Sequence, residues 1–331
     1  MIIYDGIIEK LQKNGGITIL FKELTSRIKK FKYYSYDFES HISNVGNSVI
    51  KSRPLERYRH FSPSTDGDIF HSTYYRLPTQ KNIPIVTTVH DFTYEKFVTG
   101  PARWIHSWQK NMAIKNSDKI ICISENTAND LLKYCKIPES KIAIVYNGVS
   151  EDYHPISESD KTNEIIFIGL RGGYKNFSLA VNAIALSSDF TLTIIGGGIL
   201  TADEKKMLDT LIPNRYQVLG SITNEELNIA LNRAHCLLYP SSYEGFGIPV
   251  IEAMKAGCPV IAMNASSIPE IANNSALLLD KLDKYEILSA IKTLEITSER
   301  NKFITLGLKN SSQFSWQRCS QETEQVYNTL R

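Results

Sequence analysis

The sequence predicts an α/β fold with two doubly wound, Rossmann-like domains that face a cleft. Short apolar stretches alternate with segments of helical periodicity from end to end, which is the pattern of βαβ units with parallel sheets. The chain has 331 residues, enough for two domains that each bury a core. A polar segment, residues 151–163, divides the pattern and is the expected linker. We therefore expect an N-terminal domain over residues 1–150 and a C-terminal domain over residues 164–312.

The expected strands are short and apolar, and the expected helices lie between them. Strands are predicted at residues 68–71, 84–89, 119–123, 142–145, 164–168, 191–195, 216–219, 234–239 and 259–263. Helices are predicted at residues 104–116, 125–134, 178–186, 202–211, 224–232 and 248–256. The last segment, residues 316–330, has the pattern of an amphipathic helix.

Composition favours a soluble, cytoplasmic protein. No apolar run approaches the roughly 18 residues that span a bilayer, and the N-terminal stretch lacks the apolar core of a signal peptide. The five cysteines show no metal-type spacing. Residues 1–150 carry 21 basic against 14 acidic side chains, whereas residues 151–331 carry 16 against 21. The basic half, including a cluster at residues 27–32, suggests peripheral contact with an anionic membrane, with simple solubility as the alternative. No nucleic-acid motif accompanies these charges, so nucleic acid is not an expected partner.

The most informative segment is residues 239–263, which reads as a strand, a glycine-bearing loop and a helix. Glu244 lies on the loop and Glu252 about one turn inside the helix, with Pro249 at a first helical position. The start of a helix presents free backbone N–H groups and a positive dipole end, which suit a phosphate. The two carboxylates can then reach different parts of one elongated ligand.

Three further segments carry candidate binding groups. Arg171 and Lys175 follow the strand at 164–168, where a guanidinium fork and an ammonium can clamp a diphosphate. Gly15 and Gly16 open a helix, and glycines there allow close approach of a ligand. His90, followed by Asp91, comes directly after the strand at 84–89, and site residues of α/β folds lie at such strand ends.

These motifs resemble those of the retaining glycosyltransferases of family 4, which have the GT-B fold. The resemblance implies that Glu244 contacts the donor sugar and that Glu252 binds the nucleotide ribose. It further implies that Arg171 and Lys175 neutralise the diphosphate, that His90 orients the sugar or the acceptor hydroxyl, and that Asp91 fixes its tautomer or binds acceptor. The remaining donor-binding positions that it implies, largely through backbone groups, are Gly15, Gly16, Gly220, Ser221, Ile222, Gly245, Phe246, Gly247 and Ile248. In this fold the terminal helix, here within residues 313–331, crosses back to the N-terminal domain.

The expected function is therefore transfer of a hexose, with retention, from a nucleotide diphosphosugar to an oligosaccharide or lipid-linked saccharide. By analogy the pathway is lipopolysaccharide O-antigen or another surface polysaccharide, with a GDP-mannose-type donor ahead of dTDP-rhamnose and UDP-sugars. The alternatives are a catalytically silent nucleotide-sugar-binding subunit and a nucleotide-sugar epimerase of the same fold. No cofactor and no metal are expected.

Two other motifs are interpreted structurally. Asp66-Gly67-Asp68 has the Asp-x-Asp form of metal-binding glycosyltransferases, but turn chemistry explains it. Residues 196–198 are three glycines without the spacing of a dinucleotide fingerprint, so a dehydrogenase is not expected.

Overall fold

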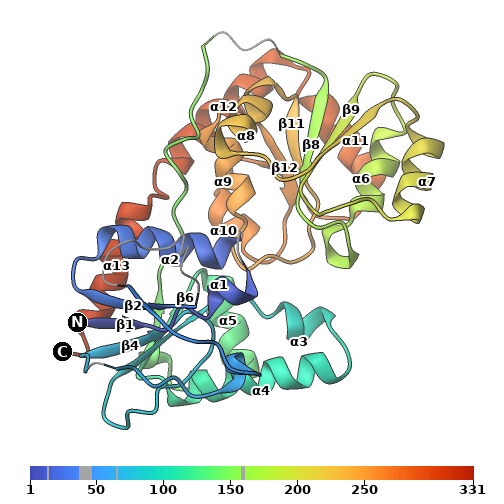
Figure 1. Ribbon diagram of the computed structural model, residues 1–331. Helices are drawn as coiled ribbons and strands as arrows, with labels where there is room; N and C mark the ends of the chain where they lie inside the picture. Colours follow the sequence, from blue (N-terminus) through green and yellow to red (C-terminus); the bar gives the residue numbers. More distant parts are fainter. Residues whose placement is uncertain (13–14, 37–46, 65, 158–160) are drawn as a thin grey trace. The chain divides into compact units, whose positions relative to one another are not determined.

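The computed structural model describes residues 1–12, 15–36, 47–64, 66–157 and 161–331, which form two compact units (Figure 1). Unit 1 comprises Met1–Gly148 and Ser315–Arg331, and unit 2 comprises Val149–Phe314. The described part of the expected linker thus belongs to unit 2. The cause is hydrogen bonding to helix α8 (Asn224–Arg233), because the backbone N–H groups of His154 and Ile156 donate to the side chains of Asn228 and Asn232 at 3.1 and 2.7 Å.

Unit 1 is built on a seven-stranded parallel sheet in the order β3-β2-β1-β4-β5-β6-β7. Its strands are β1 (Ile2–Tyr4), β2 (Phe31–Ser35), β3 (Asn47–Val49), β4 (Ile69–Ser72), β5 (Ile85–Val89), β6 (Lys119–Cys122) and β7 (Ile142–Ile144). Strands β4 to β7 lie where the sequence predicts strands, whereas β1 to β3 have no sequence prediction. β1 and β3 have only three residues each and β2 has the mixed sequence FKYYS, so none carries a clear apolar run.

The helices of unit 1 pack on this sheet and include the end of the chain. They are α1 (Ile8–Leu11), α2 (Gly16–Arg27), α3 (Thr93–Phe97), α4 (Pro101–Asn116), α5 (Glu125–Tyr134) and α13 (Trp316–Asn328). Helix α13 packs beside α2 and contributes Trp316 and Val326 to the core around β1. Its Tyr327 hydroxyl hydrogen bonds with the Tyr4 hydroxyl and with the His71 ring, at 2.9 and 2.6 Å.

Unit 2 is built on a six-stranded parallel sheet in the order β10-β9-β8-β11-β12-β13. The strands are β8 (Glu164–Ile168), β9 (Thr191–Ile195), β10 (Tyr216–Leu219), β11 (Cys236–Tyr239), β12 (Val260–Met263) and β13 (Leu277–Leu279). The helices are α6 (Phe177–Ile184), α7 (Ala202–Leu211), α8 (Asn224–Arg233), α9 (Ile248–Lys255), α10 (Ile268–Ala272), α11 (Lys284–Thr293) and α12 (Thr297–Ser311). Capping boxes at Thr201 and Thr223 fix where α7 and α8 begin.

The sheet order fixes where ligands can bind. In unit 1 the chain adds β2 and β3 on one side of β1, and then β4 and the later strands on the other side. In unit 2 it adds β9 and β10 on one side of β8, and then β11 and the later strands on the other side. The strand order therefore reverses between β1 and β4 and between β8 and β11. Loops that leave the carboxyl ends of such strand pairs diverge and leave a crevice, which is the usual ligand site of doubly wound folds. No helix within the described residues has the length and apolar character needed to cross a membrane.

Candidate donor-binding site

The candidate site of unit 2 lies at this reversal point, because Lys175 follows β8 and Glu244 follows β11. The Lys175 ammonium and the Glu244 carboxylate form an ion pair at 2.5 Å. Both side chains are largely buried, with 11 and 12% of their surface exposed, so solvent screens the pair only weakly. Two oppositely charged groups that the sequence separates by 69 positions thus meet at one point.

Tyr239, the last residue of β11, belongs to the same cluster. The Lys175 ammonium lies 3.4 Å from the Tyr239 hydroxyl, which also hydrogen bonds with Glu244. Burial, with the nearby Glu244 carboxylate, raises the pKa of this phenol well above its ordinary value, so it stays protonated. Sequence reasoning placed no functional weight on Tyr239. The feature that could have indicated it is a tyrosine hydroxyl at the carboxyl end of a strand that borders the point where the strand order reverses.

The loop that carries Lys175 is shaped by residues with positive φ. Gly169 and Gly173 have φ values of +107° and +45°, and Asn176 is left-handed at the start of α6 with φ of +53°. The Asn176 amide donates to the Pro240 carbonyl and the Ser242 hydroxyl, both at 2.8 Å. The β8 loop and the β11 loop are therefore joined before any ligand binds.

The loop that carries Glu244 is held from its other side by two serines. Ser266 accepts a hydrogen bond from the Glu244 N–H at 2.8 Å, and the Ser267 hydroxyl donates to the carbonyls of Glu244 and Phe246. The Phe246 side chain is buried and packs edge-to-face on Phe314. Gly245 therefore lies in a backbone segment that is held on both sides. Because the Phe246 side chain is buried, only the backbone of this residue is positioned to contact a ligand.

Helix α9 begins directly after this loop. Gly247 has φ of +105°, and a Cβ there would lie 2.7 Å from the Ile268 side chain, so both conformation and packing require glycine. Ile248 is the first helical residue and Pro249 follows it. Pro249 has no N–H, and the Val250 N–H donates to the Gly247 carbonyl at 3.0 Å. The start of α9 thus offers its positive dipole end, but fewer free N–H groups than the sequence motif predicts.

Glu252, on α9, is the titratable group whose pKa is most informative in unit 2. The residue as a whole is half-buried, and desolvation of its carboxyl by burial raises the pKa from 4.5 to about 7, against a lowering contribution from its hydrogen bond with Tyr153. Tyr153 is buried, also hydrogen bonds with Asn224, and belongs to the segment expected as a linker. A carboxyl whose pKa is raised to near neutral pH is typical of a ligand-binding group rather than of a solvated helix residue.

Arg171 does not join the Lys175 cluster. Its guanidinium donates to the carbonyls of Gly196, Gly198 and Ile199 at 3.1, 3.2 and 2.9 Å, and its Nε lies 3.1 Å from the Glu204 carboxylate. These donors hold the loop of three positive-φ glycines that follows β9. The N–H groups of Arg171 are thus used in hydrogen bonds to a neighbouring loop. Direct contact between Arg171 and a diphosphate stays a prediction.

The expected base-binding segment, Gly220 to Ile222, connects β10 to the cap of α8. The Gly196 N–H donates to the carbonyls of both Leu219 and Gly220, at 3.1 and 3.3 Å, so this segment and the glycine loop are adjacent. Ser221 is exposed and Ile222 half-buried. Their role in donor binding stays a prediction.

In unit 1, His90 and Asp91 lie at the carboxyl end of β5. Burial lowers the pKa of the His90 imidazole to about 4, although the Asp91 charge opposes this, so the ring is neutral at pH 7. The Asp91 carboxylate accepts from the backbone N–H of Thr93 at 2.9 Å, which closes a turn at the start of α3. A local structural role of Asp91 is thus visible, while its role toward the His90 tautomer stays a prediction. Gly15 caps α2 in an extended conformation and Gly16 is its first residue, as the sequence predicts for a helix start.

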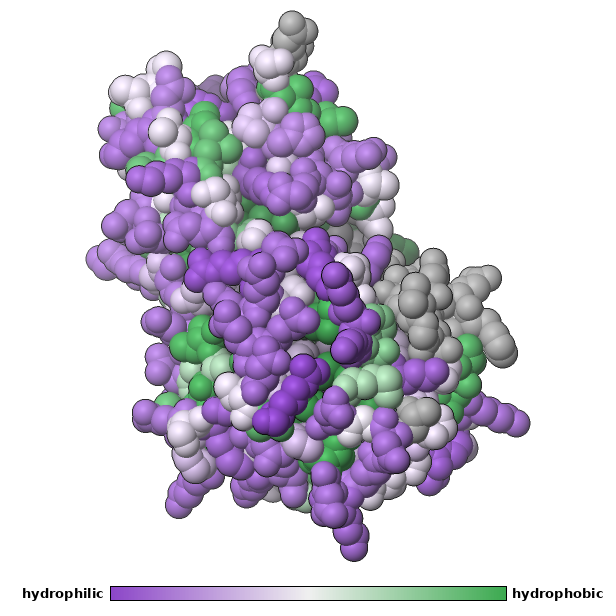
Figure 2. All heavy atoms as spheres, turned by 90° about the vertical axis from the view of Figure 1, so that its left-hand side faces the viewer, coloured by the Kyte–Doolittle hydropathy of each residue, from purple (hydrophilic) through white to green (hydrophobic). Residues whose placement is uncertain are grey.

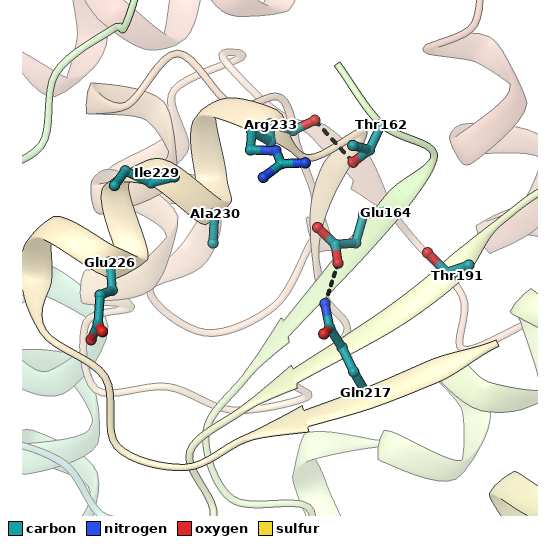
Figure 3. A pocket seen from close by; sticks show the side chains of 8 residues that line it. All are labelled: Thr162, Glu164, Thr191, Gln217, Glu226, Ile229, Ala230 and Arg233. Carbon is teal, nitrogen blue, oxygen red and sulfur yellow. Dashed lines mark hydrogen bonds between the residues drawn. The ribbon is translucent and has the colours of Figure 1, made fainter. Parts of the chain in front are cut away.

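A separate polar pocket of 380 Å³ lies at the other ends of the unit 2 strands (Figure 3). Glu164 and Thr191 begin β8 and β9, and the Glu164 carboxylate accepts from the Gln217 amide near the start of β10. This pocket is therefore at the edge opposite the Lys175 cluster. Within the described ranges no group of three or more His, Cys, Asp or Glu side chains could hold a metal ion. Asp68 pairs with the N-terminal ammonium, and Asp66 accepts from Gln80.

The chain matches two family models that overlap slightly. Residues 149–307 match the glycosyl transferases group 1, and residues 47–153 match glycosyltransferase family 4. An uncharacterized glycosyltransferase of Methanocaldococcus jannaschii is 27% identical over 96% of this chain and 95% of its own length. The O-antigen chain mannosyltransferase B of Escherichia coli is 26% identical over 88% of this chain and 85% of its own length.

Solved structures share the fold at lower identity. The sucrose-phosphate synthase of Thermosynechococcus elongatus has a TM-score of 0.80 at 17% identity and covers 99% of this chain and 98% of its own. The Anabaena protein HepE, solved with UDP and glucose, has a TM-score of 0.78 at 15% identity and covers 99% of both chains. The chain therefore has the GT-B fold. The two family models and the relatives together support its assignment as a glycosyltransferase.

Proposed function

We propose that this protein is a retaining hexosyltransferase that uses a nucleotide diphosphosugar and extends a lipid-linked saccharide of a surface polysaccharide. The observation that carries the proposal is the buried Lys175–Glu244 pair at the reversal point, flanked by the start of α9. A cation and a helix N-terminus suit a diphosphate, and a carboxylate beside them suits the hydroxyls of a sugar.

In the proposed mechanism the charge that develops on the leaving diphosphate is stabilised by Lys175 and by the backbone N–H groups at the start of α9. An ammonium has three donors, so Lys175 can keep its contact with Glu244 while it donates to a phosphate oxygen. Glu244 orients the sugar, and Glu252 accepts from the ribose hydroxyls. Arg171 acts through the glycine loop that it holds.

Retention is proposed to occur by reaction on one face of the sugar. The C1–O bond to the diphosphate breaks while the acceptor oxygen bonds to the same face of C1, and the acceptor proton passes to a leaving phosphate oxygen. No metal or cofactor is required in this scheme, because Lys175 and the positive dipole end of α9 stabilise the phosphate charge. The neutral imidazole of His90 is proposed to hydrogen bond to the sugar or the acceptor.

A GDP-mannose-type donor is the first candidate. Relatives of 26 to 28% identity include O-antigen chain mannosyltransferases of Escherichia coli and Salmonella typhimurium. UDP-sugars are the second candidate, and dTDP-rhamnose is the third.

A thermal-shift panel of GDP, UDP, dTDP and ADP with their sugar conjugates tests the donor. Stabilisation by GDP and GDP-mannose above the other pairs is expected, followed by slow release of mannose whose anomeric configuration NMR identifies as retained. Stabilisation without any sugar release or transfer would instead indicate a silent binding subunit, and conversion of the bound sugar to its epimer would indicate an epimerase.

A further inference from the structure

Helix α4 of unit 1 buries three polar side chains together with Ala113 and Ile114, and it exposes its largest apolar side chains. His106, Gln109 and Lys110 are buried on this helix, whereas Trp104 and Trp108 are 74 and 61% exposed. A helix on a protein surface normally shows the opposite arrangement. We define the α4 face as the exposed apolar side chains Trp104, Ile105, Trp108 and Met112.

The inward polar residues explain how α4 keeps this orientation. Lys110 forms an ion pair with Glu95 at 2.7 Å and donates to the Asp91 carbonyl at 2.9 Å. The His106 ring stacks on Tyr94 with centroids 3.8 Å apart. These buried contacts leave few favourable alternatives for the helix, because breaking them would leave a buried charge without a partner. The exposure of the α4 face is therefore built into the fold.

Within the α4 face, the large side chains form one stripe. Trp104, Trp108 and Met112 are spaced by four residues and so lie one above another along the helix. Trp108 and Met112 also line a pocket of 110 Å³ together with Arg57, Tyr58 and Arg59 of the neighbouring segment. The stripe thus continues into an aromatic and cationic surface from another part of unit 1.

The charge around the α4 face has one sign. Residues 101–116 contain no acidic residue, and residues 51–60 contain one, Glu56. The Glu56 carboxylate is buried and pairs with Arg53 and Arg76, so it offers little negative charge to a partner. Arg59 lines the same pocket as Trp108 and is exposed, and Arg103, next to Trp104 in the sequence, is also exposed.

We propose that the α4 face seats unit 1 on the surface of an anionic phospholipid bilayer. Tryptophan is the side chain that favours the boundary between headgroups and acyl chains, and flanking arginines attract anionic headgroups. A second copy of the chain is a poorer occupant. A two-fold contact through this face would bring its cations next to their own copies.

The basic cluster at residues 27–32 lacks such an anchor. Lys29 and Lys30 are exposed, but Phe31, the first residue of β2, packs against the core of unit 1. These lysines line a pocket together with α13 residues. The face on which α13 and the two termini lie carries mainly hydrophilic side chains, with hydrophobic ones in small separate groups (Figure 2). This cluster therefore serves as a matched control for the α4 face.

Vesicle co-sedimentation of the full chain tests the proposal without any donor. The vesicles contain phosphatidylcholine alone or an equal mixture with phosphatidylglycerol, at low and high salt. We expect binding to the anionic vesicles, with a blue shift of tryptophan emission. The chain has three tryptophans and Trp316 is buried, so the shift reports on Trp104 and Trp108.

Three double variants separate the contributions. Trp104→Ser with Trp108→Ser should weaken binding at least about tenfold at both salt concentrations, because apolar burial is lost. Arg59→Glu with Arg103→Glu should weaken it by at least about fivefold per residue at low salt, and by much less at high salt. Lys29→Glu with Lys30→Glu should stay within about twofold to threefold of the unmodified protein. Circular dichroism should show that all three are folded.

Four results would overturn the proposal. They are no binding of the unmodified protein at low salt, equal binding to phosphatidylcholine alone, wild-type binding by the tryptophan variant, and an equal loss in the lysine variant. A lipid-free dimer that the tryptophan substitutions abolish would identify a second copy as the occupant instead. None of these outcomes depends on the donor chemistry proposed above.

Discussion

Substitution of Glu252 by glutamine should stabilise the free protein and weaken nucleotide binding at the same time. The Glu252 carboxyl is isosteric with the amide, so the change removes the ionisable proton and little else. Burial makes the carboxylate unfavourable in the ligand-free protein, whereas the proposed ribose contact requires a carboxylate as acceptor. Glu252 would then favour nucleotide binding while it lowers the stability of the ligand-free protein.

The magnitude follows from the shift in the Glu252 pKa from 4.5 to about 7. The folded-state pKa of Glu252 lies above the unfolded value. The stability that this group contributes to the folded protein is therefore fully present below pH 4.5 and is lost as the pH rises through 7. A shift of this size corresponds to about 3 kcal/mol of destabilisation at pH 8, at roughly 1.4 kcal/mol per pH unit. At pH 4 the same carboxyl is protonated in both states and contributes almost nothing.

The assay is thermal unfolding of the wild type and of Glu252→Gln between pH 5 and pH 8. At pH 8 the variant should unfold about 6 to 12 °C higher, at roughly 2 to 4 °C per kcal/mol for a unit of this size, with the difference shrinking toward pH 5. Glu225→Gln, at an exposed position on α8, is the matched control and should show no such dependence. A Glu252→Gln variant that is no more stable than wild type at pH 8 would refute the desolvation argument.

The remaining predictions concern the other groups of the candidate site. Calorimetry with free nucleotide should show that Glu252→Gln binds more weakly at pH 8, and that Glu244→Gln keeps nucleotide affinity but loses about 100-fold in turnover. Equal losses of nucleotide affinity in the two variants would contradict this division of roles. Arg171→Ala removes the donors that hold the glycine loop after β9, so its melting temperature should fall by several degrees along with its turnover. Lost turnover at an unchanged melting temperature would favour direct contact with the diphosphate. Transfer activity should survive excess chelator, and complete loss that manganese or magnesium restores would contradict the structural interpretation of Asp66 and Asp68.

The sequence predicts the fold class because strand and helix periodicities are local properties. Strands β4 to β12 correspond to apolar runs that periodicity reveals, and α5 spans the predicted residues 125–134. β1 to β3 escape prediction, because their pairing partners rather than their own residues make them strands. The helix at residues 104–116 is predicted as an element, but its orientation is not. Tertiary contacts such as the buried Lys110–Glu95 pair and the His106–Tyr94 stack show which side of α4 faces inward.

The chemistry of the candidate site divides in the same way. The sequence by itself determines the residue types: two carboxylates, an ammonium and a guanidinium at loop positions after strands. It also determines where helices begin, since Gly247 and Pro249 act on their own backbone. Only the tertiary structure decides which of these groups meet. Lys175 pairs with Glu244 because β8 and β11 are neighbours in the sheet, and Arg171, four residues earlier, turns to the β9 loop instead. The pKa of Glu252 is likewise a tertiary property, because it depends on the burial of its carboxyl.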